Sequence, residues 1–346
     1  MADLLPRCLD SLLAKADVLG QLEAIVVNDG SKDDSLAVAS KYQSQYPETV
    51  TVIDKPNGNY GSTINAALPI AKGKYIKILD SDDWFDSDAL LKFMSELQNN
   101  DADMIVTHFT VVKANGKKEI SRYNVYGKQP YEYGKVYPLD KVLGDGYIRF
   151  FLMHALTYRT EMLRAMGYRQ TEGVSYTDLE WATYPVFAAN SIIFFDTNLY
   201  QYNLGREGQT MDPKVMLRSI SQLEKVTDRM IDFYVKYDKD SLSQEKLAFL
   251  SKYYLNRLRV ICKCYLFDMP RRDFDAGHFS GIESDYQKIC NQLNWGPIKL
   301  YPENKIVRFD AMKYWHRHGK RWPSWFEFFN SELNKISSYM YTLLFR

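Results

Sequence analysis

The sequence predicts an α/β fold over its first two hundred residues and an all-helical segment after them. Short apolar, β-branched runs alternate with helix-like segments between residues 4 and 112, and strands separated by helices favour parallel pairing, with helices covering the sheet. Two of these runs end in acidic turns. After Pro213, apolar residues recur at three- and four-residue steps among scattered charges, which is typical of packed helices.

The elements of the first part follow from two simple patterns. Apolar residues at helical spacing mark the helices, and short apolar runs bounded by turn residues mark the strands. The expected order is helix 4–13, strand 22–27, helix 33–46, strand 50–53, helix 62–71, strand 75–79, helix 86–97 and strand 104–112.

The second part of the α/β region is less regular. Residues 115–150 are rich in Tyr, Gly and Lys, and we interpret them as a long connection near the active site. Order returns with a strand at 155–158, a helix at 178–189 and a strand at 191–195. We therefore place a catalytic domain at residues 1–212 and a helical C-terminal domain at residues 213–346.

Composition excludes several classes of protein. The 346 residues include 46% hydrophobic and 25% charged residues, which is ordinary for a globular protein. A net charge of +1 gives no support for broad binding to nucleic acid. No apolar run approaches the roughly 20 residues that cross a bilayer, and the four cysteines lack zinc spacing and fit reduced thiols. We expect a cytoplasmic protein without a nucleic-acid partner, whose oligomeric state the sequence leaves open.

An apolar run delivers three carboxylates onto one turn, at Asp80, Asp82 and Asp83. Carboxylates this close repel one another unless a cation or hydrogen-bond donors compensate. Magnesium and manganese commonly bind one or two carboxylates together with the phosphates of a substrate. The alternative is an acidic helix N-terminus, because these residues also suit the first turn of a helix. Taken alone, the turn supports both interpretations equally.

Two further turns follow predicted strands. In Asn28-Asp29-Gly30, the carboxylate can accept a hydrogen bond from a base or ribose, and the glycine permits close backbone approach. In Asn59-Tyr60-Gly61-Ser62, backbone donors at a helix N-terminus can face a phosphate or sugar. For each turn alone, a plain strand-to-helix connection is the favoured interpretation.

Taken together, these motifs resemble the N-terminal half of the family 2 glycosyltransferases, which have the GT-A fold. The resemblance rests on residues 25–35, 59–67 and 71–84, and it covers residues 4 to about 112, with weaker similarity to about 211. It implies a mixed GT-A sheet with flanking helices. It also implies an inverting, metal-dependent transfer of a sugar from a nucleotide-sugar, UDP-linked by our interpretation, to a glycan or lipid-linked acceptor in surface polysaccharide synthesis.

The resemblance also implies roles for individual residues. Asp29 corresponds to the aspartate that binds base and ribose. Asp80-Ser81-Asp82 corresponds to the DxD motif, in which Asp82 binds Mn²⁺ or Mg²⁺ directly and Asp80 lies nearer the ribose while also serving the metal. Arg206 reaches the diphosphate, with a plain surface arginine as the alternative. The implied nucleotide-sugar-binding residues are Asp29, Gly30, Asn59, Gly61, Asp80, Ser81 and Arg206.

Inverting transfer needs one general base for the acceptor hydroxyl. Residues 176–181 resemble the acidic motif of the family, usually Glu-Asp at a helix start, although Thr177 stands where the family often has Glu. The resemblance implies Asp178 as the base and Glu180 as second choice. The alternative is that Asp178 only caps its helix. For His154, we favour a structural role over contact with acceptor or metal.

One departure from the family concerns its first strand. Members normally begin with an apolar strand at the centre of the sheet, whereas this sequence opens on the helix 4–13. We expect the chain to lack part of its nucleotide site and an upstream strand to improve stability and donor affinity. A degenerate nucleotide-sugar-binding protein is therefore the non-enzymatic alternative, and a sugar nucleotidyltransferase is the enzymatic one.

Residues 313–326 mix basic and aromatic side chains. Such mixtures occur at membrane interfaces, which would place the protein peripherally at the inner face of the plasma membrane. Aromatic residues at helical spacing more often pack in a core, so we favour packing over membrane contact for this segment.

Overall fold

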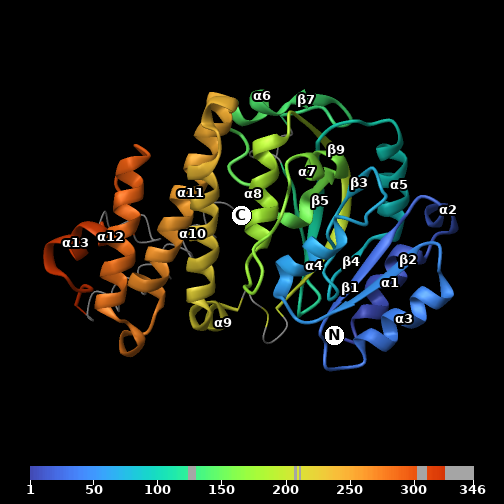
Figure 1. Cartoon of the computed structure of the whole chain (residues 1–346), viewed down its shortest axis with the longest axis horizontal. Helices are drawn as coiled ribbons and strands as arrows, with labels where there is room; N and C mark the ends of the chain where they lie inside the picture. Colours follow the sequence, from blue (N-terminus) through green and yellow to red (C-terminus); the bar gives the residue numbers. More distant parts are fainter. Residues whose placement is uncertain (124–129, 206–208, 210–211, 302–309, 324–346) are drawn as a thin grey trace. The chain divides into compact units, whose positions relative to one another are not determined.

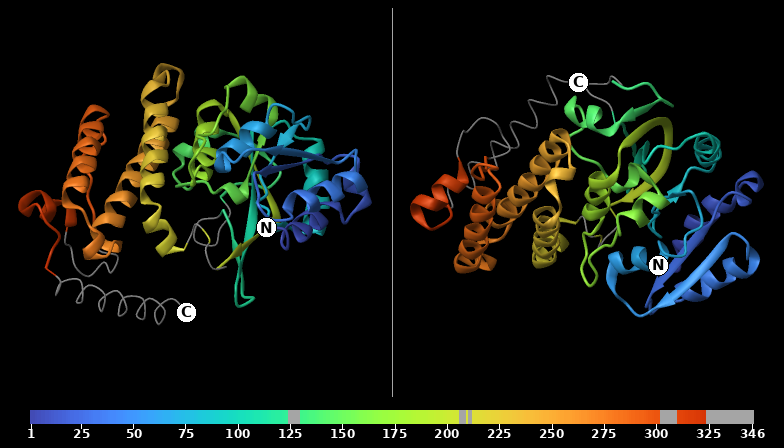
Figure 2. Two further views of the ribbon diagram at one scale, coloured as in Figure 1. Left: turned by 60° about the horizontal axis from the view of Figure 1, so that its bottom comes forward. Right: turned by 45° about the horizontal axis from the view of Figure 1, so that its top comes forward.

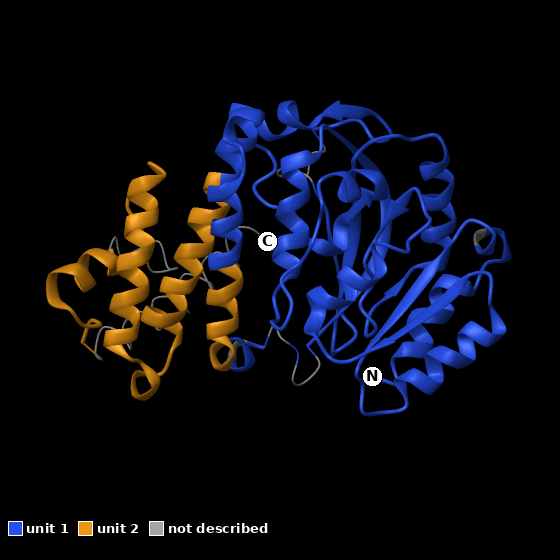
Figure 3. Ribbon diagram, viewed as in Figure 1, with its two compact units in different colours: residues 1–216, 228–250 blue, residues 217–227, 251–346 orange. Residues whose placement is uncertain are grey.

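The computed structural model describes the chain except for residues 124–129, 206–208, 210–211, 302–309 and 324–346. It divides into two compact units (Figure 3): unit 1 comprises residues 1–216 and 228–250, and unit 2 comprises residues 217–227 and 251–346. The boundaries between the units fall inside helices α10 (Ile220–Lys236) and α11 (Gln244–Lys263), so each of these helices has residues in both units. The domain boundary that we place at residues 212 and 213 stays a prediction.

Unit 1 begins with two parallel strands and their helices (Figure 1). Strand β1 pairs with β2 so that Ala24 lies opposite Val50 and Asp29 opposite Lys55. The elements are α1 (Leu5–Leu13), α2 (Ala16–Leu19), β1 (Ala24–Asp29), α3 (Ser35–Gln45), β2 (Val50–Lys55) and α4 (Asn59–Ala67). Helix α4 starts three residues earlier than expected and ends at Ala67, because Pro69 has no backbone N–H with which to continue the helical hydrogen bonds.

A larger mixed sheet follows, with the strand order β3-β8-β5-β9-β4, to which β6 and β7 add at β5 and β9. Strands β5 and β9 are parallel, and the other pairs of this sheet are antiparallel. The mixed α/β sheet of the predicted fold class is thus confirmed. Its strands are β3 (Tyr75–Ile76), β4 (Trp84–Phe85), β5 (Met104–Lys113), β6 (Lys118–Ser121), β7 (Val136–Pro138), β8 (Leu156–Arg159) and β9 (Ser191–Leu204).

Helices cover both faces of β5 and β9. Figure 1 shows α5 (Ser87–Gln98) on one side of these strands and α8 (Asp178–Ala188) on the other. Because both faces are covered, residues 104–110 of β5 are buried without alternation. The N-terminus of α5 is fixed by Asp86, whose carboxylate accepts the backbone N–H of Ala89 at 3.0 Å. Two short helices, α6 (Leu139–Gly144) and α7 (Thr160–Ala165), complete this region.

Three expectations for unit 1 were wrong in detail. The strand expected at residues 75–79 stops at Ile76, because β8 pairs only with Tyr75 and Ile76. Residues 115–150, interpreted as a long connection, contain β6, β7 and α6. Strand β9 continues past Phe195 to Leu204, because it stays paired with β5 as far as Lys113. These differences all depend on long-range pairing, which local sequence patterns do not report.

The C-terminal part of the chain is helical, as expected. Besides α10 and α11 it contains α9 (Pro213–Arg218), α12 (Ala276–Gln292) and α13 (Ala311–His318). Within unit 2, the ring of Trp315 packs against Phe274 and Phe279, and Trp322 is buried. Packing is therefore the better interpretation for these two tryptophans, whereas residues 324–326 lie outside the described residues. Of the helices that the structure describes, none has the length and apolar character to span a bilayer.

Strand β1 lies in the two-stranded sheet with β2, drawn in blue in Figure 2 (right), whereas β3 belongs to the larger sheet. In the described part of the chain, β1 pairs only with β2, and β3 only with β8. The apolar residues Ile25, Val26 and Val27 of β1 are only half-buried. One edge of each strand thus presents backbone groups that a further strand can pair with.

We expect a chain extended before Met1 by about six β-branched apolar residues, a typical strand length, to be more stable than the chain as given. Pairing with the added strand would satisfy unpaired backbone groups and bury the half-exposed apolar side chains of β1. Each kcal/mol added to the free energy of unfolding raises the melting temperature by about 2–4 °C. Thermal unfolding and UDP affinity are the measurements. An extension of equal length made of Gly and Ser is the control, and equal melting temperatures for the two extended chains would contradict the prediction.

Candidate active site

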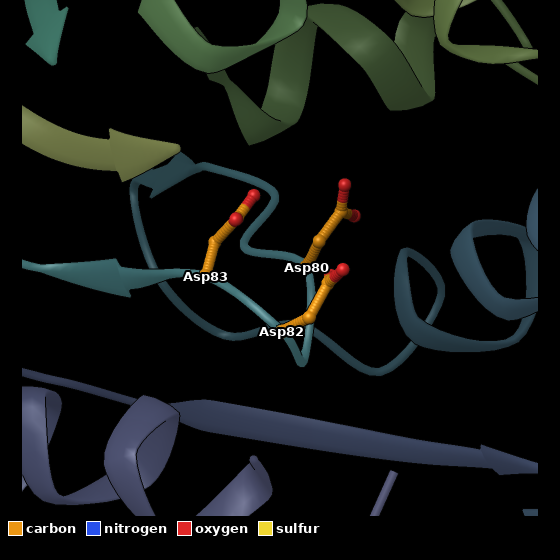
Figure 4. Close-up of side chains that lie close together, drawn as sticks. All are labelled: Asp80, Asp82 and Asp83. Carbon is orange, nitrogen blue, oxygen red and sulfur yellow. The ribbon is translucent and has the colours of Figure 1, made fainter. Parts of the chain in front are cut away.

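Three carboxylates gather on the turn between β3 and β4 (Figure 4). One oxygen each from Asp80, Asp82 and Asp83 can be chosen so that all lie within 4.8 Å of one another. Burial, together with the charges of Asp83 and Asp82, raises the pKa of Asp80 to about 8. Burial also raises the pKa of Asp83 to about 7. The protein surroundings alone therefore do not favour the ionised form of all three carboxyl groups near neutral pH.

Strand β9 holds Asp83 in place. The hydroxyl of Tyr200 donates to Asp83 Oδ2 at 2.6 Å and accepts the backbone N–H of Asp80 at 3.2 Å. The backbone N–H of Asn203 donates to Asp83 Oδ1 at 2.7 Å. Since both oxygens of Asp83 already accept hydrogen bonds, this side chain fixes the turn and leaves Asp80 and Asp82 as the better metal ligands.

The donor set fits a divalent cation. Carboxylate oxygens are the ligands that Mg²⁺ and Mn²⁺ prefer, and a cation beside Asp80 would offset the burial and the neighbouring charges that raise its pKa. The Nε2 of Gln209 lies 3.4 Å from Asp82 Oδ2, so a neutral amide contacts this carboxylate. The roles of Asp80 and Asp82 as metal ligands, and of Ser81 between them, stay predictions.

Helix α1 also contacts the acidic turn. A guanidinium nitrogen of Arg7 donates to the carbonyl oxygen of Asp82 at 3.0 Å, and the same group lies 3.8 Å from the centre of the Trp84 ring. Next to it, burial raises the pKa of the Cys8 thiol to about 12. Sequence reasoning missed Arg7, because helical spacing marks the apolar side of a helix and says nothing of what its arginine contacts.

Asp29 ends β1 and binds the start of α4. Its carboxylate forms an ion pair with Lys55 at 2.6 Å and accepts the backbone N–H of Gly58 at 2.9 Å and the hydroxyl of Ser62 at 3.1 Å. Burial opposes ionisation, but these hydrogen bonds outweigh it and lower the pKa of Asp29. The carboxylate is ionised and positioned, and its role toward base and ribose stays a prediction.

Gly30, which follows Asp29, is required at its position for steric reasons. Gly30 has a φ of +70°, a conformation that side chains other than glycine rarely adopt. A Cβ atom there would also lie 2.9 Å from the backbone nitrogen of Asn57. Gly30 therefore brings the turns after β1 and β2 together, whether or not it also approaches a ligand.

Helix α4 also contacts the acidic turn and the segment around Thr171. The hydroxyl of Tyr60 donates to Asp80 Oδ1 at 3.0 Å, and Asn59 before it has a φ of +62°. Gly61 packs so closely that a Cβ would lie 2.1 Å from the carbonyl oxygen of Thr171. The sequence predicts Asn59 and Gly61 as nucleotide-sugar-binding residues; the structure gives Gly61 a packing function, and both binding roles stay predictions.

The segment before α8 is joined to α4 and leads to the predicted base. Asn65 exchanges two hydrogen bonds with the backbone of Gln170, each 2.9 Å long. Beyond it, Asp178 begins α8 half-buried. Its charge is one of those that raise the pKa values of Asp80 and Tyr60. Asp178 therefore lies near the acidic turn, although about a hundred residues separate them in sequence.

Glu180 has a different environment. It is 0% exposed, and its carboxylate accepts the backbone N–H of Thr171 at 2.7 Å, the Thr171 hydroxyl at 2.6 Å and the Tyr184 hydroxyl at 3.2 Å. Burial nevertheless raises its pKa. A carboxylate enclosed in this way secures the segment before α8, so the geometry favours Asp178 over Glu180 as the base. Both catalytic roles stay predictions.

His154 and Lys77 form part of the wall around the acidic turn. The imidazole lies among the rings of Phe109, Tyr200 and Tyr202, and burial together with the nearby Lys77 lowers its pKa to about 3. Lys77 donates to the carbonyl oxygen of His154 at 2.8 Å. The arrangement fits the structural role that we favour for His154. Arg206, predicted to reach the diphosphate, lies outside the described residues.

Comparison with known proteins identifies the family of the N-terminal region. The profile described as "Glycosyl transferase family 2" matches residues 2–167, just under half of the chain, and this region is a family 2 glycosyltransferase region. The "Uncharacterized glycosyltransferase MG025 homolog" of Mycoplasma pneumoniae is 37% identical over 107 residues, 30% of this chain and 34% of that protein. The poly(ribitol-phosphate) beta-glucosyltransferase of Bacillus spizizenii is 36% identical over 116 residues, 33% of this chain and 18% of that enzyme. The matched region thus spans about a third or less of either relative.

The fold is similar to that of residues 1–349 of TarS from S. aureus in complex with UDP. The TM-score is 0.58 at 15% identity, over 92% of this chain and 84% of that one. The same TarS segment in complex with UDP-GlcNAc matches with a TM-score of 0.51 at 17% identity, over 85% and 86% of the two chains. At this level of identity the comparison supports the GT-A fold and says nothing of individual residues.

We expect Tyr200→Phe to loosen the acidic turn. The substitution leaves the ring in place but removes the donor to Asp83 and the acceptor for Asp80, and an unsatisfied buried polar group costs about 1–3 kcal/mol. Urea unfolding measures the stability, and Mn²⁺ titration measures the effect on the turn. Tyr202→Phe makes the same chemical change two residues further along β9, at a tyrosine other than the one that donates to Asp83, and is the matched control. Equal losses in both variants would show that the Tyr200 hydroxyl has no special role.

Proposed function

We propose that this protein transfers a sugar from a UDP-linked donor to a glycan or lipid-linked acceptor with inversion and with a divalent cation. The observation that carries the proposal is the clustering of Asp80 and Asp82 on one turn, within the region that matches family 2, with the charge of Asp178 close enough to affect Asp80. The complexes of TarS with UDP and UDP-GlcNAc support the UDP-linked donor. The sugar and the linkage are not part of the proposal.

The donor lies, in this proposal, along the carboxyl ends of β1, β2 and β3, where ligands commonly bind in open α/β sheets. Asp29 faces the base and ribose, and Asp80 and Asp82 hold Mn²⁺ or Mg²⁺ beside the diphosphate. When bound, the cation stabilises negative charge on the departing nucleotide. The ionised Asp29 is already fixed by Lys55 and Gly58, so it needs no reorganisation to accept a hydrogen bond from the donor.

The transfer itself requires the removal of one proton. Asp178 takes the proton of the acceptor hydroxyl while that oxygen attacks the anomeric carbon, and the bond from that carbon to the diphosphate oxygen breaks. A single attack from the opposite side inverts the anomeric configuration. Hydrogen bonds between Asn65 and Gln170 hold the segment that precedes Asp178 against α4, which fixes the base relative to the acidic turn.

The two alternative functions differ in what they require. A nucleotidyltransferase needs a glycine-rich, lysine-bearing phosphate loop near the first strand, whereas the turn here is Asn28-Asp29-Gly30 and Lys55 is paired with Asp29. A non-catalytic binding protein would use the donor site without a base. The half-buried Asp178 near Asp80 favours catalysis over binding alone.

We expect Mn²⁺ and a UDP-sugar together to stabilise the protein more than the sum of their separate effects. The diphosphate supplies oxygen ligands to a cation held by Asp80 and Asp82, so each ligand improves the binding of the other. Thermal-shift measurements over a panel of UDP-sugars, with and without Mn²⁺, test this expectation.

The control for this screen is Asp82→Ala. It should abolish the response to Mn²⁺ while a metal-independent response to UDP remains. Additive shifts for every donor, or an unchanged response in Asp82→Ala, would count against the proposed metal and donor site.

We expect Asp178→Asn to lower turnover by roughly a hundredfold or more, with nearly normal donor binding. The amide keeps the size of the side chain but cannot accept the proton. Release of UDP in the presence of acceptor measures turnover, and the thermal shift with UDP-sugar and Mn²⁺ measures binding.

Glu180→Gln provides the comparison. Because Glu180 accepts three hydrogen bonds inside the fold, its substitution should lower the melting temperature and leave the folded protein active. Near-native turnover in Asp178→Asn together with loss of turnover in a folded Glu180→Gln protein would assign the base to Glu180.

A further inference from the structure

The segment from residue 147 to 152, which we call the 147–152 segment, exposes large apolar side chains. Tyr147 is 49% exposed, Phe150 51% and Leu152 38%. They account for three of the nine large apolar residues that are exposed in the described part of the chain. Single exposed apolar residues are normal on a protein surface, but grouped ones mark binding sites. The grouping therefore needs an explanation.

The segment itself is firmly held. Ile148 and Phe151 are buried between the exposed residues, and the ring of Phe151 packs against Tyr123 and Phe249. The backbone N–H of Leu152 donates to the hydroxyl of Tyr123 at 2.6 Å. Tyr147 contacts the buried ring of Tyr131 edge-on, with ring centres 6.3 Å apart. The exposed side chains thus belong to an anchored piece of backbone, which lowers the entropic cost of binding a ligand.

The segment runs directly into the candidate active site. Its next residue, Met153, is buried, and its sulfur lies 2.7 Å from the hydroxyl of Tyr60. The same hydroxyl donates to Asp80. One residue of backbone and one tyrosine therefore connect the exposed apolar side chains with the carboxylates of the acidic turn.

We infer that the 147–152 segment binds the acceptor glycan beyond the sugar that reacts. The faces of sugar rings carry C–H groups that pack on aromatic rings, and binding sites combine such rings with a few polar groups. Arg149, exposed between Tyr147 and Phe150, supplies donors for sugar hydroxyls or acidic substituents. This inference rests on the proposed function and adds that the acceptor is a chain of at least two sugar units.

A glycan fits the segment better than a lipid bilayer does. The exposed side chains belong to a short stretch of backbone whose next residue, Met153, contacts Tyr60 and through it Asp80, so a ligand bound to this stretch lies close to the reacting groups. A bilayer surface would need a broad apolar face fringed by several cations, whereas this segment carries one arginine.

Glycan-array binding in the presence of UDP and Mn²⁺ tests the inference. The array carries bacterial surface glycans from single sugars to hexasaccharides. We expect the wild-type protein to bind chains in preference to single sugars, and Phe150→Ser and Tyr147→Ser each to weaken chain binding by about tenfold. Both substitutions are at exposed positions, so the melting temperature should stay near that of the wild type. Tyr301→Ser, at an equally exposed aromatic residue in unit 2, should bind as the wild type does.

The outcomes separate this inference from the proposed function. If the UDP-sugar and Mn²⁺ responses are intact but chain binding is absent or is unchanged in both variants, the 147–152 segment is not the acceptor site. Binding to phosphatidylglycerol vesicles that Phe150→Ser abolishes, without binding to any glycan, would assign the segment to a membrane and overturn the inference. Loss of the UDP-sugar response itself would refute the proposed function.

Discussion

The repulsion among three carboxylates on one short turn is the constraint on which the rest of this structure depends. Asp80, Asp82 and Asp83 lie on four consecutive residues, and burial raises the pKa values of Asp80 and Asp83. Such a turn persists only if other elements supply donors. Tyr200 and Asn203 of β9, Arg7 of α1 and Tyr60 of α4 supply them. The elements around the turn therefore hold the three carboxyl groups in place, and a bound cation would offset the mutual repulsion of their ionised forms.

The sequence predicted those parts of the site that lie at the ends of local elements. Asp29 ends a strand, Asp80 to Asp83 follow another, and Asp178 begins a helix, and each position can be located from apolar periodicity and turn residues alone. Their use in donor binding and catalysis came from resemblance to a family. The mixed sheet also came from that resemblance, because the alternation of strands and helices by itself favours parallel pairing, whereas most pairs of the larger sheet are antiparallel.

The remainder depends on contacts that no local pattern reports. Arg7 reaches a carbonyl oxygen of a residue far along the chain, and Tyr200 connects β9 with Asp83. Likewise, no local pattern reports that Gly61, for which the resemblance implies a place beside the donor, packs closely against the carbonyl of Thr171. The length of β3 also depends on a distant contact. The apolar run continues to residue 79, but the strand ends at Ile76, where its pairing with β8 ends.

Helix α4 has a particular position in this arrangement, because the proposed donor site is divided between two sheets. Asp29 belongs to the β1–β2 pair, and Asp80 follows a strand of the larger sheet. The hydroxyls of Ser62 and Tyr60 of α4 bond Asp29 and Asp80, respectively, and the same helix binds Gln170 before the predicted base. A donor that contacts Asp29 with its base and Asp80 with its diphosphate would bridge the same two sheets as α4 does. Ligand binding and the joining of the sheets would then stabilise each other, since a ligand that binds only the joined state shifts the equilibrium toward it.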